Sequence, residues 1–334
     1  MSANKTINVA VIGLGYWGPN LIRNLLKIPL VSAVYGCDLL EKNIQSIKRD
    51  FPNVILTKNY AEILRNKEID AIVIATPIST HYKLAKEALV AGKNVLVEKP
   101  MTTTSKDARE LIKVAKRMNK VLMAGHTFVY AETIREIKSL IEKGQLGKTY
   151  YYDSTRINLG LIQKDSDVIW DLAPHDLSII NYLFSEKVIS VQAFGSKFVG
   201  NNSEIAHIFL NLENNISVHI NISWLSPVKM RSIIIGGSKK MIVYNDIEPS
   251  EKIKIYDKGV IPESITPFIP AYRSGDVVIP NIEQKEALLT ELLHFVDCII
   301  NRKEPLTSGE NGLKIVSYLE AVEKALKTRK EVFL

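Results

Sequence analysis

Short, continuous apolar segments alternate with amphipathic stretches through the first 125 residues. Six of these segments are rich in Val, Ile and Ala: Ile7–Ile12, Val31–Cys37, Val54–Thr57, Ala71–Ala75, Asn94–Glu98 and Val121–Ala124. Because they are apolar on both faces, they are typical of strands covered on both sides, as in a parallel sheet. Between them, His81–Ala91 and Ser105–Met118 carry apolar residues on one helical face, with Ser105 as the expected N-cap. The alternation predicts an α/β fold with an N-terminal Rossmann domain, a doubly wound parallel sheet.

Apolar and polar residues alternate with period two after about Gly125. The clearest segments are Thr149–Asn158, Ile189–Val199, Glu204–Leu212, Ile216–Trp224 and Arg231–Ile235. Such alternation indicates half-buried strands, so we expect a C-terminal α+β domain with an open, mostly antiparallel sheet. Helices are expected over residues 132–143, 176–184, 282–301 and 308–328, and a long loop over 258–280, where Pro and Gly recur.

These patterns predict two domains, in agreement with a length of 334 residues. We expect a dinucleotide-binding Rossmann domain at residues 1–125 and an α+β substrate-binding and oligomerisation domain at residues 126–334. The N-terminal residues lack the apolar core of a signal peptide, and no apolar run approaches a membrane span. The sequence therefore predicts a cytoplasmic protein with no membrane partner.

Charge and composition exclude some classes of partner. Hydrophobic residues make up 46% of the chain and charged residues 24%, the balance of a soluble globular protein. The net charge of +7 admits an anionic ligand, but Lys and Arg are scattered and form no basic run, so no nucleic-acid partner is expected. Cys37 and Cys298 have no metal or redox spacing, and we interpret both as buried, reduced thiols.

A glycine motif follows the first predicted strand directly. Gly13, Gly15 and Gly18 form a G-x-G-x-x-G turn that opens the predicted helix Tyr16–Leu26. The first glycine permits the sharp turn, the second lets a pyrophosphate approach the backbone, and the third lets the helix pack on the strand. The helix N-terminus would then point its amides at the phosphates. A strand before the motif and a helix after it are the context that a dinucleotide site requires.

Asp38 ends the second predicted strand, twenty residues after Gly18. A carboxylate at this place accepts hydrogen bonds from the ribose of NAD and repels the 2′-phosphate of NADP. The sequence therefore favours NAD as cofactor, with NADP less favoured. A cap on the next helix is the alternative role for Asp38, and FAD or a nucleotide sugar is an alternative occupant of the unit.

Glu98, Lys99 and Pro100 lie at the end of the fifth predicted strand. In an open α/β sheet the ligand lies in the crevice beyond the carboxyl ends of the strands, so these side chains should face the cofactor. A partly desolvated lysine near a nicotinamide cation should have a lowered pKa and be usable as a base. A surface lysine in a tight turn is an equal alternative.

Asp171 and His175 are four residues apart, so on a helical turn both would face the same way. Asp171 could orient the imidazole or bind a substrate hydroxyl, and His175 could move the proton. A histidine preceded by Pro174 could instead belong to a helix N-terminus. No third ligand of the right kind lies nearby in the sequence, so no metal site is expected.

Taken together, these motifs resemble the Gfo/Idh/MocA family of NAD(P)-dependent oxidoreductases, over nearly the whole chain. The residues that carry the resemblance are Gly13–Gly18, Asp38, Thr76, Pro77, His81, Glu98, Lys99, Pro100 and Asp171–His175. The resemblance implies that Lys99 acts in catalysis beside the nicotinamide, that His175 is an acid/base, and that Asp171 contacts substrate or His175. It also implies that residues of the glycine turn and the 76–81 stretch line the cofactor (Tyr16, Trp17, Thr76, Pro77 and His81), with Glu98 near the nicotinamide half. A cis peptide at Lys99–Pro100 is a further implication.

Within the family, the segments 13–20, 125–128 and 171–177 are similar to the nucleotide-sugar branch, which includes UDP-N-acetylglucosaminuronate 3-dehydrogenases of surface-polysaccharide pathways. Arg156 and Asn158 follow a strand expected to cross the active-site face, and we expect both to bind substrate. An Arg on an exposed strand face is the alternative. The resemblance also implies a homodimer or homotetramer.

The sequence thus predicts an NAD-dependent oxidoreductase that acts on a secondary alcohol of a sugar, at C3 of a nucleotide sugar. Lys99, alone or together with His175, would remove the hydroxyl proton while hydride passes to the nicotinamide. A 3-ketoreductase of a nucleotide-linked deoxysugar and an inositol or free-polyol dehydrogenase are the enzymatic alternatives. A non-catalytic NAD-binding protein is a weaker alternative, because it would have no reason to keep Lys99, Asp171 and His175 together.

Overall fold

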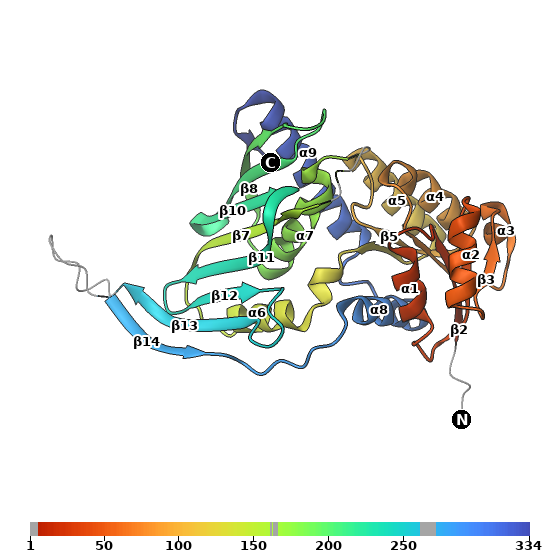
Figure 1. Ribbon diagram of the computed structural model, residues 1–334, viewed down its shortest axis with the longest axis horizontal. Helices are drawn as coiled ribbons and strands as arrows, with labels where there is room; N and C mark the ends of the chain where they lie inside the picture. Colours follow the sequence, from red (N-terminus) through yellow and green to blue (C-terminus); the bar gives the residue numbers. More distant parts are fainter. Residues whose placement is uncertain (1–5, 161, 163–165, 261–271) are drawn as a thin grey trace. The chain divides into compact units, whose positions relative to one another are not determined.

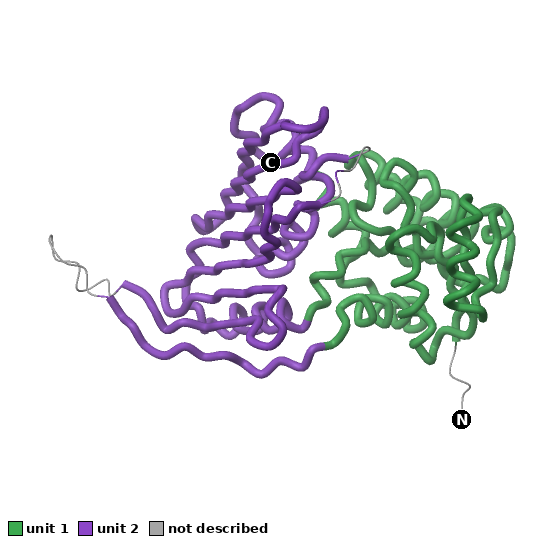
Figure 2. The backbone as a smooth tube through the Cα atoms, in the orientation of Figure 1, with its two compact units in different colours: residues 1–131, 285–317 green, residues 132–284, 318–334 purple. Residues whose placement is uncertain are grey.

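The computed structural model describes residues 6–160, 162, 166–260 and 272–334, and these residues form two compact units. Unit 1 comprises residues 1–131 and 285–317, and unit 2 comprises residues 132–284 and 318–334, as coloured in Figure 2. The chain therefore returns to unit 1 after completing most of unit 2. The sequence patterns predicted a single domain border, between residues 125 and 126. Because these patterns are local, they do not indicate that a later segment packs with the first domain.

Unit 1 is built on a parallel sheet of six strands, which confirms the predicted Rossmann architecture (Figure 1). The strands are β1 (Ile7–Ile12), β2 (Val31–Cys37), β3 (Ile55–Thr57), β4 (Ala71–Ile74), β5 (Asn94–Glu98) and β6 (Leu122–Gly125). Their order in the sheet is β3-β2-β1-β4-β5-β6. This order reverses between β1 and β4, and that switch point is where a doubly wound sheet binds a dinucleotide.

Helices cover both faces of this sheet. They are α1 (Gly18–Leu25), α2 (Glu41–Asp50), α3 (Tyr60–Arg65), α4 (Ile78–Val90), α5 (Ser105–Met118), α8 (Ala287–Asn301) and the first part of α9 (Gly309–Thr328), with the 3-10 turn η1 (Thr127–Tyr130) after β6. Contacts join α4 with α5 and α1 with α8, and Figure 1 shows the two pairs on opposite faces of the sheet. The predicted N-cap Ser105 is the first residue of α5, and the cap is Thr104, whose side chain accepts from the Asp107 backbone.

Unit 2 contains a nine-stranded sheet with the order β14-β13-β12-β11-β7-β10-β9-β8-β15. The bounds are β7 (Thr149–Leu159), β8 (Val188–Ser196), β9 (Ile205–Leu212), β10 (Ile216–Ser223), β11 (Leu225–Gly237), β12 (Met241–Asn245), β13 (Ile253–Val260), β14 (Tyr272–Val278) and β15 (Val332–Phe333). The β7–β10 pair is parallel, and every other neighbouring pair is antiparallel. The predicted open, mostly antiparallel sheet is confirmed.

The prediction of a long loop over residues 258–280 is wrong at both ends. Residues 258–260 belong to β13, residues 272–278 form β14, and the two strands pair antiparallel. Nearly every residue of β14 is exposed, so this edge strand has no buried face and leaves no period-two pattern to detect. Residues 261–271 of the expected loop lie outside the described residues.

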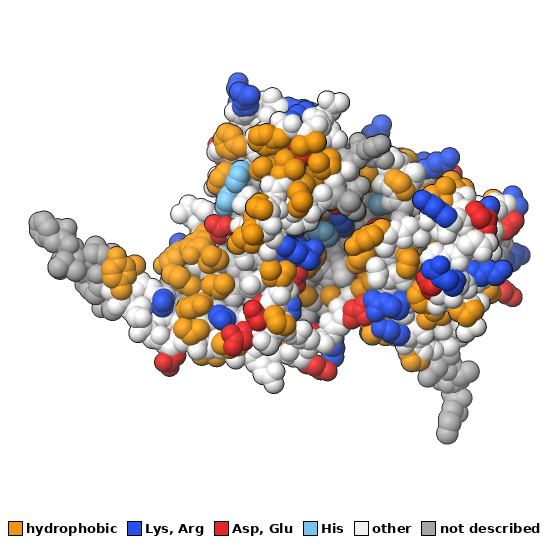
Figure 3. Space-filling view, viewed as in Figure 1, with side chains coloured by type: hydrophobic (Ala, Val, Ile, Leu, Met, Phe, Trp, Pro, Cys, Tyr) orange, Lys and Arg blue, Asp and Glu red, His pale blue; other side chains and the backbone are white. Residues whose placement is uncertain are grey.

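Two helices, α6 (Glu132–Glu142) and α7 (Val168–Leu183), pack together, and α7 packs on β9 and β10. Side chains that alternate with the buried ones point away from this layer and stay exposed, among them Tyr151, Phe194, Phe209 and Ile234. Figure 3 shows hydrophobic side chains gathered over the strands of unit 2. None of the helices in the described part of the chain combines the length and apolar character that a membrane crossing requires.

Candidate active site

The glycine turn has the geometry that its three glycines predict. Gly13 has a φ of +94°, and a Cβ there would lie 2.5 Å from the Ala75 carbonyl oxygen. A Cβ on Gly18 would lie 2.4 Å from the Gly13 carbonyl oxygen. No described atom lies within 4 Å of a Cβ placed on Gly15. The outer glycines are therefore required by packing, whereas the middle one leaves open space where a pyrophosphate fits against the backbone.

Asp38 joins the end of β2 to the glycine turn. Its Oδ2 accepts hydrogen bonds from the Leu14 backbone at 2.7 Å and from Asn43 Nδ2 at 3.0 Å, and its Oδ1 accepts from the Leu40 backbone at 2.8 Å. A carboxylate can accept about four hydrogen bonds, so these three leave room for a ribose hydroxyl. Asp38 thus holds the chain that enters α2, and its contact with a ribose stays a prediction.

The two aromatic residues of the turn lie differently. Tyr16 is 89% exposed, so its ring makes little contact with the protein. The Trp17 indole Nε1 donates to Glu98 Oε1 at 2.7 Å and thereby links the glycine turn to the end of β5. Trp17 thus orients a carboxylate at the crevice edge, a role that the sequence did not indicate.

The Glu98–Lys99–Pro100 turn follows β5, and the Lys99–Pro100 peptide is cis, as the resemblance implied. The buried His81 holds this turn against the end of β4. Its ring nitrogens lie 2.9 Å from the Pro100 carbonyl oxygen and 2.8 Å from that of Thr76. Burial lowers the pKa of His81, opposed by these hydrogen bonds. Pro77 is the N-cap of α4, so the 76–81 stretch is tied to the lysine turn through one imidazole.

Two buried residues beside this turn were missed by sequence reasoning. Glu291 of α8 is 0% exposed, and its Oε2 accepts from the Thr127 hydroxyl at 2.6 Å. His126, directly after β6, is 2% exposed, and both of its ring nitrogens lack a hydrogen-bond partner among the described residues. Burial raises the pKa of Glu291, and the charge of Glu98 raises it further. Burial and the charge of Lys99 lower the pKa of His126 to about 4.

Asp171 and His175 lie on α7, one helical turn apart on the same face. The helix begins at Val168, capped by Asp167, which accepts from the Trp170 backbone at 2.9 Å. The predicted start at residue 176 is therefore too late, because Pro174 is accommodated inside the helix. His175 lies in the middle of α7, which contradicts the alternative of a helix N-terminus.

Trp224 is a further residue of this region that the sequence did not single out. It follows β10, is 2% exposed, and donates from its indole Nε1 to Asp171 Oδ2 at 3.1 Å. A Cβ placed on Gly160 would lie 3.1 Å from the Trp224 ring and 3.2 Å from Asn158 Nδ2. Asn158 and Asp171, both predicted to bind substrate, therefore lie near the same tryptophan side chain.

Arg156 of β7 pairs with α7 at Asp176, the residue directly after His175. Its side chain is buried, and its Nε lies 2.8 Å from Asp176 Oδ2. The Tyr152 hydroxyl donates to Asp176 Oδ1 at 3.4 Å. This pairing gives Arg156 a structural role inside the unit, in contrast to the exposed strand face weighed from the sequence. Contact of Arg156 with substrate stays a prediction.

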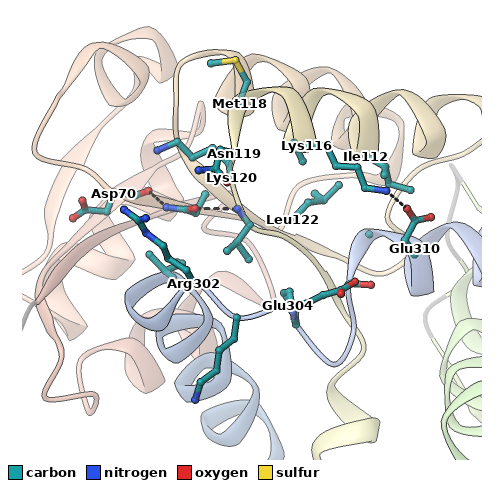
Figure 4. A pocket seen from close by; sticks show the side chains of 18 of the residues that line it. Asp70, Ile112, Lys116, Met118, Asn119, Lys120, Leu122, Arg302, Glu304 and Glu310 are labelled. Carbon is teal, nitrogen blue, oxygen red and sulfur yellow. Dashed lines mark hydrogen bonds and ion pairs between the residues drawn. The ribbon is translucent and has the colours of Figure 1, made fainter.

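A pocket in unit 1 lies at the amino ends of β4, β5 and β6, the sheet edge opposite the glycine turn (Figure 4). Charges of both signs line it, including Asp70, Lys116, Lys120, Arg302 and Glu310, and Lys116 pairs with Glu310 at 2.7 Å. The predicted cofactor residues do not line this pocket. Among the described residues, no three His, Cys, Asp or Glu side chains gather where they could hold a metal ion.

Comparison with known proteins assigns both domains of the chain to a family. Residues 7–126 match the family described as "Oxidoreductase family, NAD-binding Rossmann fold", and residues 134–243 match "GFO/IDH/MocA C-terminal domain". The chain belongs to the Gfo/Idh/MocA family of oxidoreductases. It is therefore an NAD(P)-dependent oxidoreductase whose Rossmann unit binds NAD.

Relatives of this oxidoreductase include dehydrogenases with different substrates. A UDP-N-acetylglucosamine 3-dehydrogenase of Acidithiobacillus ferrooxidans is 25% identical, over 78% of this chain and 80% of the relative. A scyllo-inositol 2-dehydrogenase (NAD(+)) of Bacillus subtilis is 24% identical, over 90% and 89%. The solved structure of the Acidithiobacillus ferrooxidans enzyme has a TM-score of 0.82 at 23% identity and covers 97% of this chain and 98% of that chain. This structural likeness shows the shared fold.

Proposed function

We propose that this oxidoreductase oxidises a secondary alcohol of a sugar with NAD, at C3 of a UDP-N-acetylglucosaminuronate-like nucleotide sugar. The observation that carries the proposal is the Asp171–His175 pair on one face of α7, in a domain whose relatives include a UDP-N-acetylglucosamine 3-dehydrogenase. A free polyol is the second candidate, favoured by the similarity to the scyllo-inositol dehydrogenase.

Unit 1 supplies the cofactor residues of this proposal. Gly13, Gly15 and Gly18 hold the pyrophosphate, and Asp38 accepts a ribose hydroxyl. The remaining cofactor residues follow the carboxyl ends of β1, β4 and β5: Tyr16, Trp17, Thr76, Pro77, His81, Glu98 and Lys99. NAD supplies the acceptor for the hydride that leaves the alcohol carbon.

The proton chemistry falls to Lys99 and His175. Lys99 takes the hydroxyl proton, and its ammonium then stabilises the developing negative charge on the oxygen. Asp171 fixes substrate or the His175 ring, and the Trp224 indole in turn holds the Asp171 carboxylate. Asn158, beside the same tryptophan, binds sugar hydroxyls.

We further propose that the protein works in the cytoplasm in surface-polysaccharide biosynthesis and assembles as a homodimer or homotetramer. The exposed apolar residues of the unit 2 sheet support the assembly, because contiguous apolar patches mark interaction surfaces. Light scattering coupled to size-exclusion chromatography tests it, and a monomer at micromolar concentration contradicts it.

A substrate panel separates the two candidates. The purified protein is given NAD together with a UDP-N-acetyl-hexosaminuronate, a UDP-N-acetylhexosamine, scyllo-inositol, myo-inositol or a free hexose, and NADH absorbance is followed. We expect kcat/KM for the uronate to exceed that for each free polyol by at least about tenfold. Preference for an inositol would overturn the nucleotide-sugar proposal in favour of the second candidate.

A further inference from the structure

Three elements of unit 1 bring acidic and basic side chains together behind the lysine turn. Glu98 ends β5, His126 follows β6, and Glu291 comes from α8, far along the chain. A Cβ placed on Gly125 would lie 3.2 Å from the Glu98 carboxyl group, so the absence of a side chain at Gly125 admits that carboxyl. The three side chains are called the Glu98–Glu291–His126 cluster below.

The hydrogen-bond donors in this cluster are too few for two carboxylate charges. Glu98 accepts from the Trp17 indole at 2.7 Å and from the Lys99 backbone at 3.3 Å. Glu291 accepts at Oε2 from the Thr127 hydroxyl and interacts with the His126 backbone amide, while its buried Oε1 has no partner among the described residues. A charged carboxylate whose buried oxygen has no hydrogen-bond donor lowers the stability of the folded protein. Protonation of the carboxylate removes this penalty.

The charged and titratable groups around the cluster favour one negative charge. Before the cofactor binds, the Lys99 ammonium beside Glu98 supplies a positive charge, and His126 is held neutral by its burial. The Tyr130 hydroxyl of η1 is kept protonated by burial and by the charge of Glu291. Between α1 and α8, Arg23 pairs with Glu286 at 2.5 Å near the surface and leaves the interior charge unchanged. Both carboxyl groups lie against residues 125–127, because Glu98 packs against Gly125 and Glu291 accepts from Thr127. Two like charges held at neighbouring residues in a buried site share one proton.

The cluster lies on the nicotinamide side of the switch point. Asp38, directly after β2, is the proposed ribose residue, so the other half of a dinucleotide bound there would extend over β4, β5 and β6. Glu98 is at the carboxyl end of β5, where it keeps part of its surface exposed. Open space at Gly15 and the two unpartnered buried groups, His126 and Glu291 Oε1, fit a polar cofactor at this edge.

We propose that Glu98 and Glu291 together hold one proton in the unliganded protein, release it when the positively charged nicotinamide of NAD⁺ binds, and retain it when uncharged NADH binds. An added positive charge favours the ionised pair, whereas the neutral dihydronicotinamide does not. By linkage, NAD⁺ affinity rises with pH and NADH affinity does not.

This assignment also accounts for the proton that alcohol oxidation produces. The alcohol carbon loses a hydride to the nicotinamide, and the hydroxyl loses a proton to the enzyme. Once the ring charge is lost, Lys99 would pass the proton that it took from the hydroxyl to the pair, and the pair would hold this proton until NADH leaves. Glu291 is thus a positioning residue that sets the charge of Glu98, with no contact to substrate required.

Calorimetric titration of the intact protein with NAD⁺ and with NADH tests the assignment without any sugar substrate. Titrations at pH 7 in phosphate and in Tris, which differ in ionisation enthalpy, give the number of protons released per nucleotide. We expect NAD⁺ to release up to about one proton and NADH to release none. Equal release by both nucleotides overturns the assignment.

Glu291→Gln removes the shared proton and keeps an oxygen that can accept from Thr127. We expect this variant to release less than about a third of the wild-type proton number on NAD⁺ binding and to lose the rise of NAD⁺ affinity with pH. Glu310→Gln, the same exchange in an exposed pair with Lys116, is the control and keeps both properties. Thermal unfolding confirms that each variant is folded, and Glu98→Gln provides a second variant if Glu291→Gln does not fold. Undiminished release from a folded Glu291→Gln or Glu98→Gln protein overturns the assignment.

Discussion

Arg156 and Asp176 form an ion pair inside unit 2, with Arg156 Nε 2.8 Å from Asp176 Oδ2 and both side chains buried. Removing one partner of such a pair leaves an uncompensated buried charge. We expect Arg156→Met to lower the free energy of unfolding by about 3–5 kcal/mol, measured by denaturant titration.

The matched control is Arg231→Met, which breaks a more exposed pair with Asp246 in the same sheet. The free energy of unfolding of that variant should fall by no more than about 1 kcal/mol. If Arg156→Met were as stable as wild type and raised KM for substrate, Arg156 would be a binding residue instead of a structural one.

The outer and middle glycines of the turn should respond differently to alanine. Gly15→Ala places its methyl group in open space, so the protein should fold normally while NAD affinity falls by about tenfold or more. Gly18→Ala forces its Cβ against the Gly13 carbonyl oxygen and should destabilise unit 1 by about 1–3 kcal/mol. Thermal unfolding and NAD titration separate the two outcomes, and a stability loss for Gly15→Ala alone would contradict this assignment.

Asp38→Ser tests the selection of NAD. The change removes the negative charge that would repel a 2′-phosphate, while the serine hydroxyl can still accept a hydrogen bond near Leu14. We expect the ratio of kcat/KM for NAD to that for NADP to fall by about tenfold or more. An unchanged ratio would place cofactor selection elsewhere.

Lys99→Met removes the proposed base and keeps a side chain of similar length. Turnover should fall by about 10²–10⁴-fold, because a positioned acid/base contributes that much, while NAD still binds. Lys113→Met, on the exposed face of α5, is the control and should keep wild-type turnover. Turnover within about tenfold of wild type for Lys99→Met would exclude Lys99 as the base.

His126 should make stability depend on pH. Its folded pKa of about 4 lies below the unfolded value of 6.5, so between these values the unfolded chain binds the proton and the folded chain does not. Its contribution to the free energy of unfolding is therefore present above pH 6.5 and is lost as the pH falls toward 4.

His126→Leu removes this titration and, because both ring nitrogens lack partners, removes no described hydrogen bond of the side chain. When the pH is lowered from 7.5 to 5, the free energy of unfolding of the variant should rise by about 2 kcal/mol relative to that of wild type. Denaturant titration at the two pH values measures the difference, and a pH-independent difference would show that His126 is not buried as a neutral ring.

The motifs and the secondary structure of unit 1 could be predicted because each depends on neighbouring residues. The bounds of β1, β2, β5 and α5 match the apolar pattern, and the glycine turn follows from the backbone conformation of Gly13 and the close approach at Gly18. Prediction failed where the pattern was weak, as in the exposed edge strand β14, or where a proline falls inside α7.

The sequence alone determined the Rossmann unit, the dinucleotide turn and the Asp171–His175 pair, since helix and strand periodicity and glycine conformation are local properties. Only the tertiary structure decided which polar residues face one another: Arg156 with Asp176, Trp224 with Asp171, and Thr127 with Glu291. The reason is that the charge and pKa of a side chain depend on burial and on partners far away in the chain, and neither leaves a periodic trace in the sequence.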